Sequence, residues 1–181
     1  MDVLEAIKNR RSTRNYEPTP IPKDKLVRIL EAARVAPSAS NRQPWHFIVV
    51  TDAEKRKVLS HGMFAKFLTS VPVVIVACGD TKTSPEWYAV DVSLAMENMA
   101  LAATGLDLAT CFIGSFDEAT VKKAVGVPER LSVVAMLALG YSKEKEGVAG
   151  QLIRLVQRRK TLEEIVSLEE YGRKYDPEQI H

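Results

Sequence analysis

The spacing of apolar and polar positions divides the chain into short helices and strands. Apolar side chains at helical intervals predict a helix over Val3–Arg10, with Leu4 and Ile7 facing the core, and a second helix over Lys23–Val35. Continuous apolar or β-branched runs are typical of buried strands. Such strands are expected at Trp45–Val50, Val71–Cys78, Asp107–Ile113 and Leu131–Leu139.

Polar or mixed stretches predict the remaining helices, over Ala53–Leu59, over Gly62–Leu68 and from Asp117 to Gly126. A longer helix is predicted over Pro85–Thr104, where Ser84 and Pro85 resemble a helix start. Its apolar residues fall on nearly all sides of the axis. A helix of that kind is buried all round, so we expect it at the centre of the fold or at a subunit interface.

The segment Pro37–Pro44, called here the platform loop, carries small and amide side chains between two prolines. It precedes the predicted strand Trp45–Val50, which would support it. Short side chains would let a flat ligand approach the backbone, and Asn41 and Gln43 can donate and accept hydrogen bonds. The segment is either such a binding surface or an ordinary connection between a helix and a strand.

Length and composition limit the class of protein. With 181 residues, 46% of them hydrophobic, we expect one domain over residues 1–166 and a polar tail over residues 167–181. A net charge of +2 favours no nucleic-acid partner. No apolar run reaches the ~20 residues of a membrane helix, and the N-terminus lacks the order of a signal peptide. Cys78 and Cys111 are far apart in sequence and form no CxxC pair, which indicates buried thiols in a reducing compartment. We therefore expect a cytoplasmic protein that does not enter membranes.

Two basic clusters stand near the ends of the chain, Asn9–Arg14 and Arg154 with Arg158–Lys160. Each is either a solvated surface or a phosphate site, because guanidinium groups bind phosphate oxygens in pairs. Glycine-rich phosphate loops and nucleophile elbows are absent, and the three histidines lack the spacing of metal ligands, so no metal site is predicted. An enzyme with this sequence would rely on a cofactor, and both clusters with the platform loop indicate a mononucleotide with a flat ring.

Several motifs in order along the chain carry a family resemblance: Arg10–Arg14, the run PSASNRQPWHF, Cys111–Gly114, LALGY, and Arg159–Glu164. With them the chain resembles the nitroreductase family of FMN-dependent oxidoreductases. The resemblance implies an α+β fold with a central mixed, mostly antiparallel sheet flanked by helices. It also implies an intertwined homodimer with FMN at the interface, the tail 167–181 packing on the partner subunit.

The resemblance also assigns roles to residues. Arg10, Ser12, Arg159 and Lys160 would hold the FMN phosphate, with Arg11 alongside, while Arg14 and Lys66 would lie at the pyrimidine side of the ring. The platform loop of the other subunit would line the ring with Pro37, Ser38, Ala39, Ser40 and Asn41. Of the segment Cys111, Phe112, Ile113 and Gly114, the last two would approach the ring centre through backbone amides. Arg14, Ile113 and Gly114 are the expected catalytic residues.

The expected reaction is electron transfer from NAD(P)H through flavin N5 to a nitroaromatic, quinone or similar small oxidant, with ping-pong kinetics. Reductive dehalogenation and flavin breakdown are alternative chemistries on this fold. A flavin-binding protein without enzymatic activity is a further alternative. The last alternative is a nucleic-acid binder that uses the two basic clusters. Such a protein would bind DNA or RNA and would carry no flavin.

Overall fold

The computed structural model describes residues 1–61, 65–143 and 159–179, and the chain divides into two compact units, residues 1–143 and 144–181. In the second unit, the described part holds the short helix α7 (Leu162–Ile165) and the 3₁₀ turn η3 (Pro177–Gln179). An antiparallel bridge also joins Ser167 to Lys174. The domain boundary expected at residue 166 stays a prediction.

The first unit is built on a four-stranded sheet in the order β1-β2-β4-β3. Its strands are β1 (Trp45–Val50), β2 (Val73–Asp80), β3 (Ala109–Ile113) and β4 (Leu131–Gly140). Every neighbouring pair is antiparallel, and the extended chain at Ser12 adds a parallel bridge to Thr110. The predicted α+β class with a mostly antiparallel sheet is confirmed. Only Val50 of β1 is fully buried, because this strand lies at the sheet's edge.

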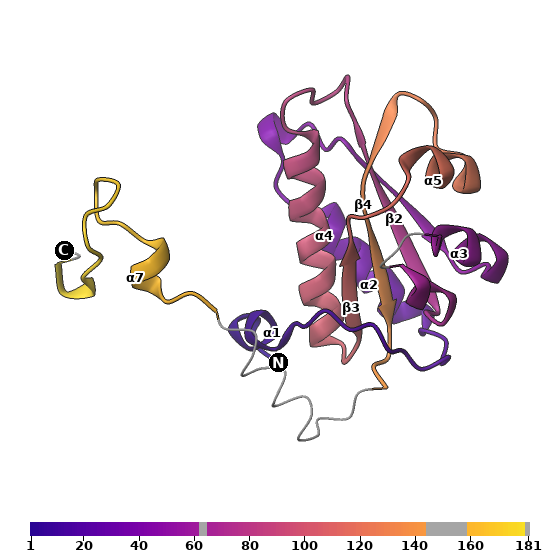
Figure 1. The fold of residues 1–181 in the computed structure, drawn as a ribbon, viewed down its shortest axis with the longest axis horizontal. Coiled ribbons are helices and arrows are strands. Elements are labelled where there is room, and N and C mark those ends of the chain that lie inside the picture. The colour runs from indigo at the N-terminus through magenta and orange to yellow at the C-terminus, as the bar shows by residue number, and fades with distance from the viewer. Residues whose placement is uncertain (62–64, 144–158, 180–181) are drawn as a thin grey trace. The chain divides into compact units, whose positions relative to one another are not determined.

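Helices cover both faces of the sheet (Figure 1). The α-helices of the unit are α1 (Val3–Asn9), α2 (Lys23–Arg34), α3 (Ala53–Leu59), α4 (Tyr88–Gly105) and α5 (Glu118–Val125). The 3₁₀ turns are η1 (Ala39–Asn41) and η2 (Lys66–Thr69). Helices α2 and α4 pack on one face, while α3 and α5 pack on the other.

Strand β2 lies in the interior and supplies both cores. Val74 and Val76 point to the core under α3 and α5, whereas Ile75 and Ala77 point to the core under α2 and α4. This alternation follows from the two-residue period of a strand. All of β2 from Val73 to Gly79 is buried, as the continuous apolar run predicted. The buried strand anchors the loops that carry the candidate site.

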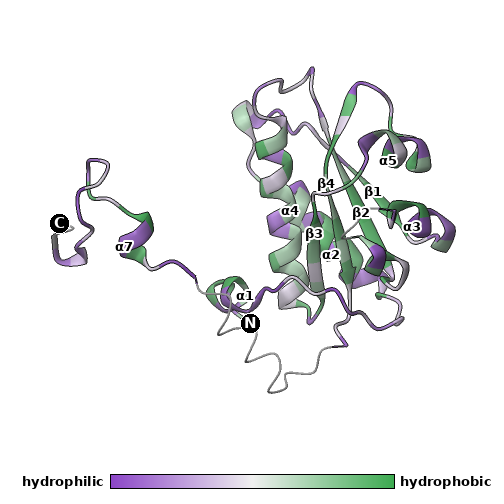
Figure 2. Ribbon diagram, in the orientation of Figure 1, coloured by the Kyte–Doolittle hydropathy of each residue, from purple (hydrophilic) through white to green (hydrophobic). Residues whose placement is uncertain are grey.

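Helix α4 differs from its prediction in two ways. It begins at Tyr88 rather than at Ser84 and Pro85, and its surface is not covered all round. One side is buried through Val92, Met96 and Met99, but Val90 and Leu94 are 47% and 43% exposed. The expectation of burial on every side is wrong for the single chain. In Figure 2 the ribbon of α4 carries green hydrophobic stretches along its length.

The prediction that Leu4 and Ile7 face the core is also wrong. Their exposed fractions are 63% and 52%, and Ala6 is the buried residue of α1. The helix forms as expected, because Asp2 and Glu5 make the capping box at its start. Helix α1 packs against α4. Together they expose a surface called here the α1–α4 apolar face: Val3, Leu4, Ile7, Val90 and Leu94.

Across the described ranges, none of the helices combines the length and the apolar character that spanning a membrane would need.

Candidate functional site

The arginine segment, residues 10–14, is fixed along the edge strand β3. The Thr13 amide donates a hydrogen bond to the Thr110 carbonyl at 2.9 Å, and Ser12 makes the parallel bridge to the same residue. Thr13 is buried, whereas Ser12 and Arg14 are exposed. An extended chain points alternate side chains to opposite sides, so Ser12 and Arg14 share the outer side.

The chain that follows the arginine segment is bound to the end of β4. The Glu17 amide donates to the Tyr141 carbonyl at 2.9 Å, and the Lys143 amide donates to the Asn15 carbonyl at 3.0 Å. Between them the buried ring of Tyr16 stacks on Phe67 of η2, with ring centroids 6.2 Å apart. These contacts hold the backbone on which Arg14 stands.

Arg10 is oriented by a carboxylate that sequence reasoning missed. Its Nε lies 3.7 Å from Oε1 of Glu97 on α4, and its side chain is only 19% exposed. Glu97 is about half exposed, so the pair is open to solvent on one side. The ion pair itself contributes little stability in that setting, but it restrains the Arg10 guanidinium beside α4.

The thiol of Cys111 lies buried in β3, and burial raises its pKa. The charge of Arg14, a hydrogen bond with Ser12 and the charge of Arg10 act in the opposite direction on this pKa. Of these three residues, Arg10 and Ser12 are predicted phosphate ligands, whereas Arg14 is predicted at the pyrimidine side of the ring.

The platform loop has an unusual backbone. Ser40, Asn41 and Gln43 have φ angles of 52°, 54° and 48°, which side-chain-bearing residues rarely adopt. Ser38 accepts a hydrogen bond from the Gln43 amide at 3.0 Å through its Oγ. Ser40 and Asn41 are exposed, so the loop presents its short side chains and backbone to solvent.

Two longer-range hydrogen bonds fasten the platform loop to the rest of the unit. The Ala39 amide donates to Oδ1 of Asp91 on α4 at 3.0 Å. The Asp80 amide donates to the Pro44 carbonyl at 2.8 Å. Asp91 was also missed by sequence reasoning, although a carboxylate between the apolar residues of the predicted helix is a signal that could have found it.

Platform loop and arginine segment contact α4 at different places. Glu97 follows Asp91 by six residues on α4. In an α-helix this spacing places the two side chains ~9 Å apart along the axis and about 120° apart around it. Asp91 is on the buried side of α4 and Glu97 on the exposed side. Within one chain, the two groups of predicted residues thus contact different sides of this helix.

The other predicted site residues lie at separate positions. Ile113 ends β3 with a buried side chain, and Gly114 is exposed, with no atom within 4 Å of where a Cβ would stand. Phe112 is half-buried on the α4 side of the sheet. Lys66 is exposed at the start of η2, beside the Phe67 that stacks on Tyr16.

The C-terminal basic residues belong to the second unit. Arg159 and Lys160 are exposed and directly precede the capping box that Thr161 and Glu164 make at the start of α7. Arg154 and Arg158 of the predicted cluster lie outside the described residues. The meeting of this cluster with the arginine segment stays a prediction.

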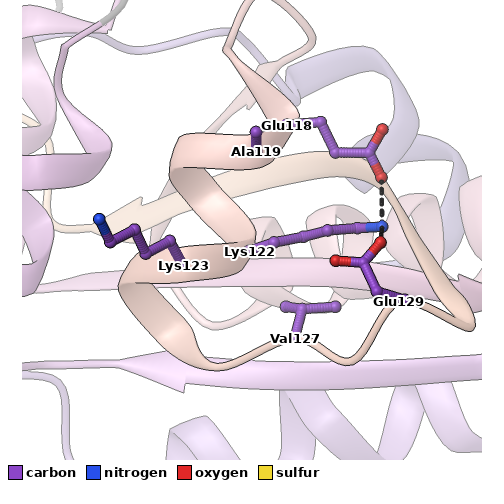
Figure 3. Close-up of a pocket in the computed structure, with 6 residues that line it drawn as sticks. All are labelled: Glu118, Ala119, Lys122, Lys123, Val127 and Glu129. Atoms are coloured by element: carbon purple, nitrogen blue, oxygen red, sulfur yellow. Dashed lines mark ion pairs between the residues drawn. The ribbon is translucent and has the colours of Figure 1, made fainter.

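A surface hollow of about 460 Å³ lies elsewhere, beside α5 (Figure 3). Lys122 extends between Glu118 and Glu129, 3.4 Å and 3.7 Å from their carboxylate oxygens. A second hollow of about 300 Å³ is lined by residues of α2 and β1, including Arg34 and His46. None of the predicted site residues lines either hollow.

The exposed groups fit an FMN molecule in their chemistry. The arginine segment offers guanidinium groups and a hydroxyl, the donors that a phosphate requires. Ser38, Ala39 and Ser40 of the platform loop, and Gly114, offer backbone without bulky side chains, which a flat ring can approach closely.

Comparison with known proteins agrees with this chemistry. The model of the family described as "Nitroreductase family" matches residues 7–67 and 60–141. A putative NADH dehydrogenase/NAD(P)H nitroreductase of Archaeoglobus fulgidus is 37% identical over 153 residues, which cover 80% of this chain and 88% of that protein.

Solved structures give the same result. An FMN-dependent nitroreductase from Clostridium difficile R20291 is 30% identical with a TM-score of 0.73, covering 87% of this chain and 99% of that one. The NADPH:FMN oxidoreductase from Vibrio harveyi, solved in complex with NAD⁺, is 25% identical with a TM-score of 0.82. That match covers 96% of this chain and 79% of that one. The chain described here belongs to the nitroreductase family.

Proposed function

We propose that the protein is an FMN-dependent NAD(P)H oxidoreductase. It acts as a cytoplasmic homodimer and reduces a nitroaromatic, quinone or similar small oxidant in a ping-pong cycle. The observation that carries the proposal is the fastening of the arginine segment along the edge strand β3, with Ser12 and Arg14 exposed on its outer side and Arg10 paired with Glu97. Relatives described as NAD(P)H nitroreductase and FMN-dependent nitroreductase support the choice of cofactor and donor.

Arg10 and Ser12 would hold the phosphate of FMN. Arg10 is already oriented by Glu97, so less side-chain entropy is lost on binding than for a free surface arginine. Arg11 stands alongside with an exposed side chain. Arg159 and Lys160 are the exposed cations that would complete the phosphate site.

The ring would lie on the platform loop of the partner subunit, because the two groups contact different sides of α4 within one chain. Pro37, Ser38, Ala39, Ser40 and Asn41 would line it. The backbone amides of Ile113 and Gly114 would approach the ring centre, and Lys66 would stand at the pyrimidine edge. Phe112 and Cys111 would support this contact from within β3.

When bound, FMN supplies the electron-carrying centre that accepts hydride from NAD(P)H at N5 and passes electrons to the oxidant. Arg14 would stabilise the negative charge that builds up on the pyrimidine side, because a fixed cation near developing charge lowers its energy. No side chain is assigned as general acid or base. One exposed pocket would serve NAD(P)H first and the oxidant second, which explains the ping-pong expectation.

The homodimer would be formed through the α1–α4 apolar face. Val3, Leu4, Ile7, Val90 and Leu94 are each between 43% and 65% exposed in the single chain. Exposed apolar side chains on two helices that pack together are candidates for an interaction site. The tail 167–181 would pack on the partner.

The first experiment is the visible spectrum of the purified protein, followed by anaerobic addition of NADH and NADPH in turn. A flavin spectrum that bleaches with either nucleotide is the expected result and names the donor. A flavin that stays oxidised with both NADH and NADPH would contradict the proposed oxidoreductase activity and would favour a flavin-binding protein without enzymatic activity. A colourless protein that fails to take up added FMN would overturn the proposed cofactor.

A further inference from the structure

Asp91 is a buried carboxylate beneath the platform loop. It is 2% exposed, its Oδ1 accepts from the Ala39 amide at 3.0 Å, and its Oδ2 accepts from Oγ of Ser84 at 3.3 Å. In the described ranges, Asp91 takes part in no ion pair. Burying a carboxylate costs free energy unless the group is hydrogen-bonded. The Ala39 amide and the Ser84 hydroxyl offset that cost for Asp91.

The donor Ala39 stands directly before the strained part of the platform loop. Ser40 and Asn41 follow it with positive φ, and Gln43 repeats that conformation. Positive φ in residues with side chains persists only where surrounding contacts impose it. The hydrogen bond from Ala39 to a buried side chain on α4 is such a contact, since Asp91 is held in the first turn of a helix of 18 residues.

We propose that Asp91 is a positioning residue that fixes the platform loop in the conformation that receives the flavin ring. The proposal rests on the proposed function, because the platform loop is the part of the protein assigned to the ring. Asp91 itself touches no ligand. It acts through the Ala39 amide, across 52 residues of sequence.

The choice of residue type supports this role. A carboxylate has two acceptor oxygens, and here each oxygen takes one donor. Asparagine at this position could keep its oxygen toward Ala39 and turn its amide nitrogen toward Ser84, whose hydroxyl can also accept. Alanine would leave the Ala39 amide without its acceptor. D91A removes both the acceptor and the charge, whereas D91N removes the charge alone. Comparing the two variants therefore separates the effect of the hydrogen bond from the effect of the charge.

The first test needs no cofactor. Hydrogen exchange of the Ala39 amide is measured in the wild-type protein, D91A, D91N and S84A. We expect exchange at Ala39 to speed up at least about tenfold in D91A, because an amide that loses its acceptor loses protection of that order. D91N and S84A should stay near wild type, since both keep an acceptor for Ala39. Amides of β2 report the global stability of each variant. Unchanged exchange at Ala39 in D91A would overturn the proposal.

The second test measures FMN binding to the cofactor-free protein, with the visible circular dichroism of the bound flavin as a spectroscopic readout. D91A should raise the FMN dissociation constant about tenfold and alter the dichroism. D91N should restore both. An FMN affinity that D91A leaves unchanged, or that D91N fails to restore, would contradict a positioning role.

One more variant covers the case in which D91A does not fold. Ala39→Pro removes the donor without touching the buried helix, and Ser38 already has the extended φ of −145° and ψ of 154° that a following proline requires. It should weaken FMN binding as D91A would, and wild-type affinity in this variant would refute the inference. If the wild-type protein binds no FMN, the proposed function fails, whereas the exchange test still decides whether Asp91 fixes the loop.

Discussion

The amide of Thr13 and the carbonyl of Thr110 form a 2.9 Å hydrogen bond that fastens the arginine segment to the edge of the sheet. Residues remote in sequence are brought together by this contact. Because it is a backbone contact, it keeps the segment in place whichever side chains flank it. Substitutions of the arginines therefore test their chemistry with little risk to the fold.

Arg10→Ala should weaken FMN binding about 10–100-fold, because hydrogen bonds to a charged group each contribute ~1.5–3 kcal/mol. Riboflavin has no phosphate, so its affinity should stay unchanged. Titration of the cofactor-free protein with both flavins measures the difference. The matched control is Arg34→Ala, which removes an ion-paired arginine from α2. An equal loss for FMN and riboflavin would refute the phosphate role.

Arg14→Ala should leave FMN bound but slow its reduction by NAD(P)H at least about tenfold, since a lost electrostatic contact in the transition state costs ~1.4 kcal/mol per tenfold of rate. Arg14→Lys should recover part of the rate by keeping the charge. Stopped-flow absorbance under anaerobic conditions follows the step. A rate in Arg14→Ala equal to that of the wild type would exclude this residue from catalysis.

Leu94→Glu should separate the proposed homodimer, because it puts a charge into the α1–α4 apolar face. Val27→Glu on α2 is the matched control, since Val27 is 54% exposed and Leu94 43%. Sedimentation velocity gives the mass of each variant. FMN affinity should fall together with the mass, as the site would be completed by the partner. A Leu94→Glu protein that stays dimeric would place the interface elsewhere.

Gly140→Ala should destabilise the fold by about 1–3 kcal/mol, the usual cost of overpacking. A Cβ at Gly140 would lie 2.7 Å from Cδ of Pro72 and 3.0 Å from Cδ1 of Tyr16. Gly105→Ala is the control, because nothing lies within 4 Å of its Cβ position at the end of α4. Urea unfolding of the two variants measures the contrast. Equal stability would show that Pro72 and Tyr16 can move aside.

Cys78 should make the protein less stable at high pH. Burial, with the charge of Glu118, raises the pKa of this thiol from 9.0 to about 11. The native state then keeps a proton that the unfolded chain loses, so the stabilising contribution is complete below pH 9.0 and is lost as pH rises to about 11. Urea unfolding between these pH values should show a steeper decline in the wild type than in Cys78→Ala. Parallel curves would contradict the raised pKa.

The sequence predicted the elements of the fold where local signals are strong. Val73–Gly79 is buried throughout because a continuous apolar run suits an interior strand. Asp117 caps α5 and Gly126 ends it with a φ of 72°, as their residue types indicate. For α1 the local spacing wrongly predicted that Leu4 and Ile7 face the core. Apolar spacing shows that a helix has an apolar side, but it does not show which surface covers that side.

The start of α4 and the site partners could not be found in the same way. Ser84 resembles a helix cap, but its hydroxyl donates to Asp91 instead, and the helix begins later. The arginine segment and platform loop were recognisable as motifs. Their supports on α4, Glu97 and Asp91, lie 87 and 52 residues away from Arg10 and Ala39, so no local pattern pairs them with these residues.

The contact between Ala39 and Asp91 has a consequence for which substitutions the platform loop of this protein can accept. Asp91 holds a main-chain amide, which nearly every amino acid at position 39 would also provide. The backbone shape of the platform loop therefore does not depend on a side chain at position 39. Side chains that tolerate a positive φ can replace Ser40 and Asn41 while the hydrogen bond from Ala39 to Asp91 stays in place.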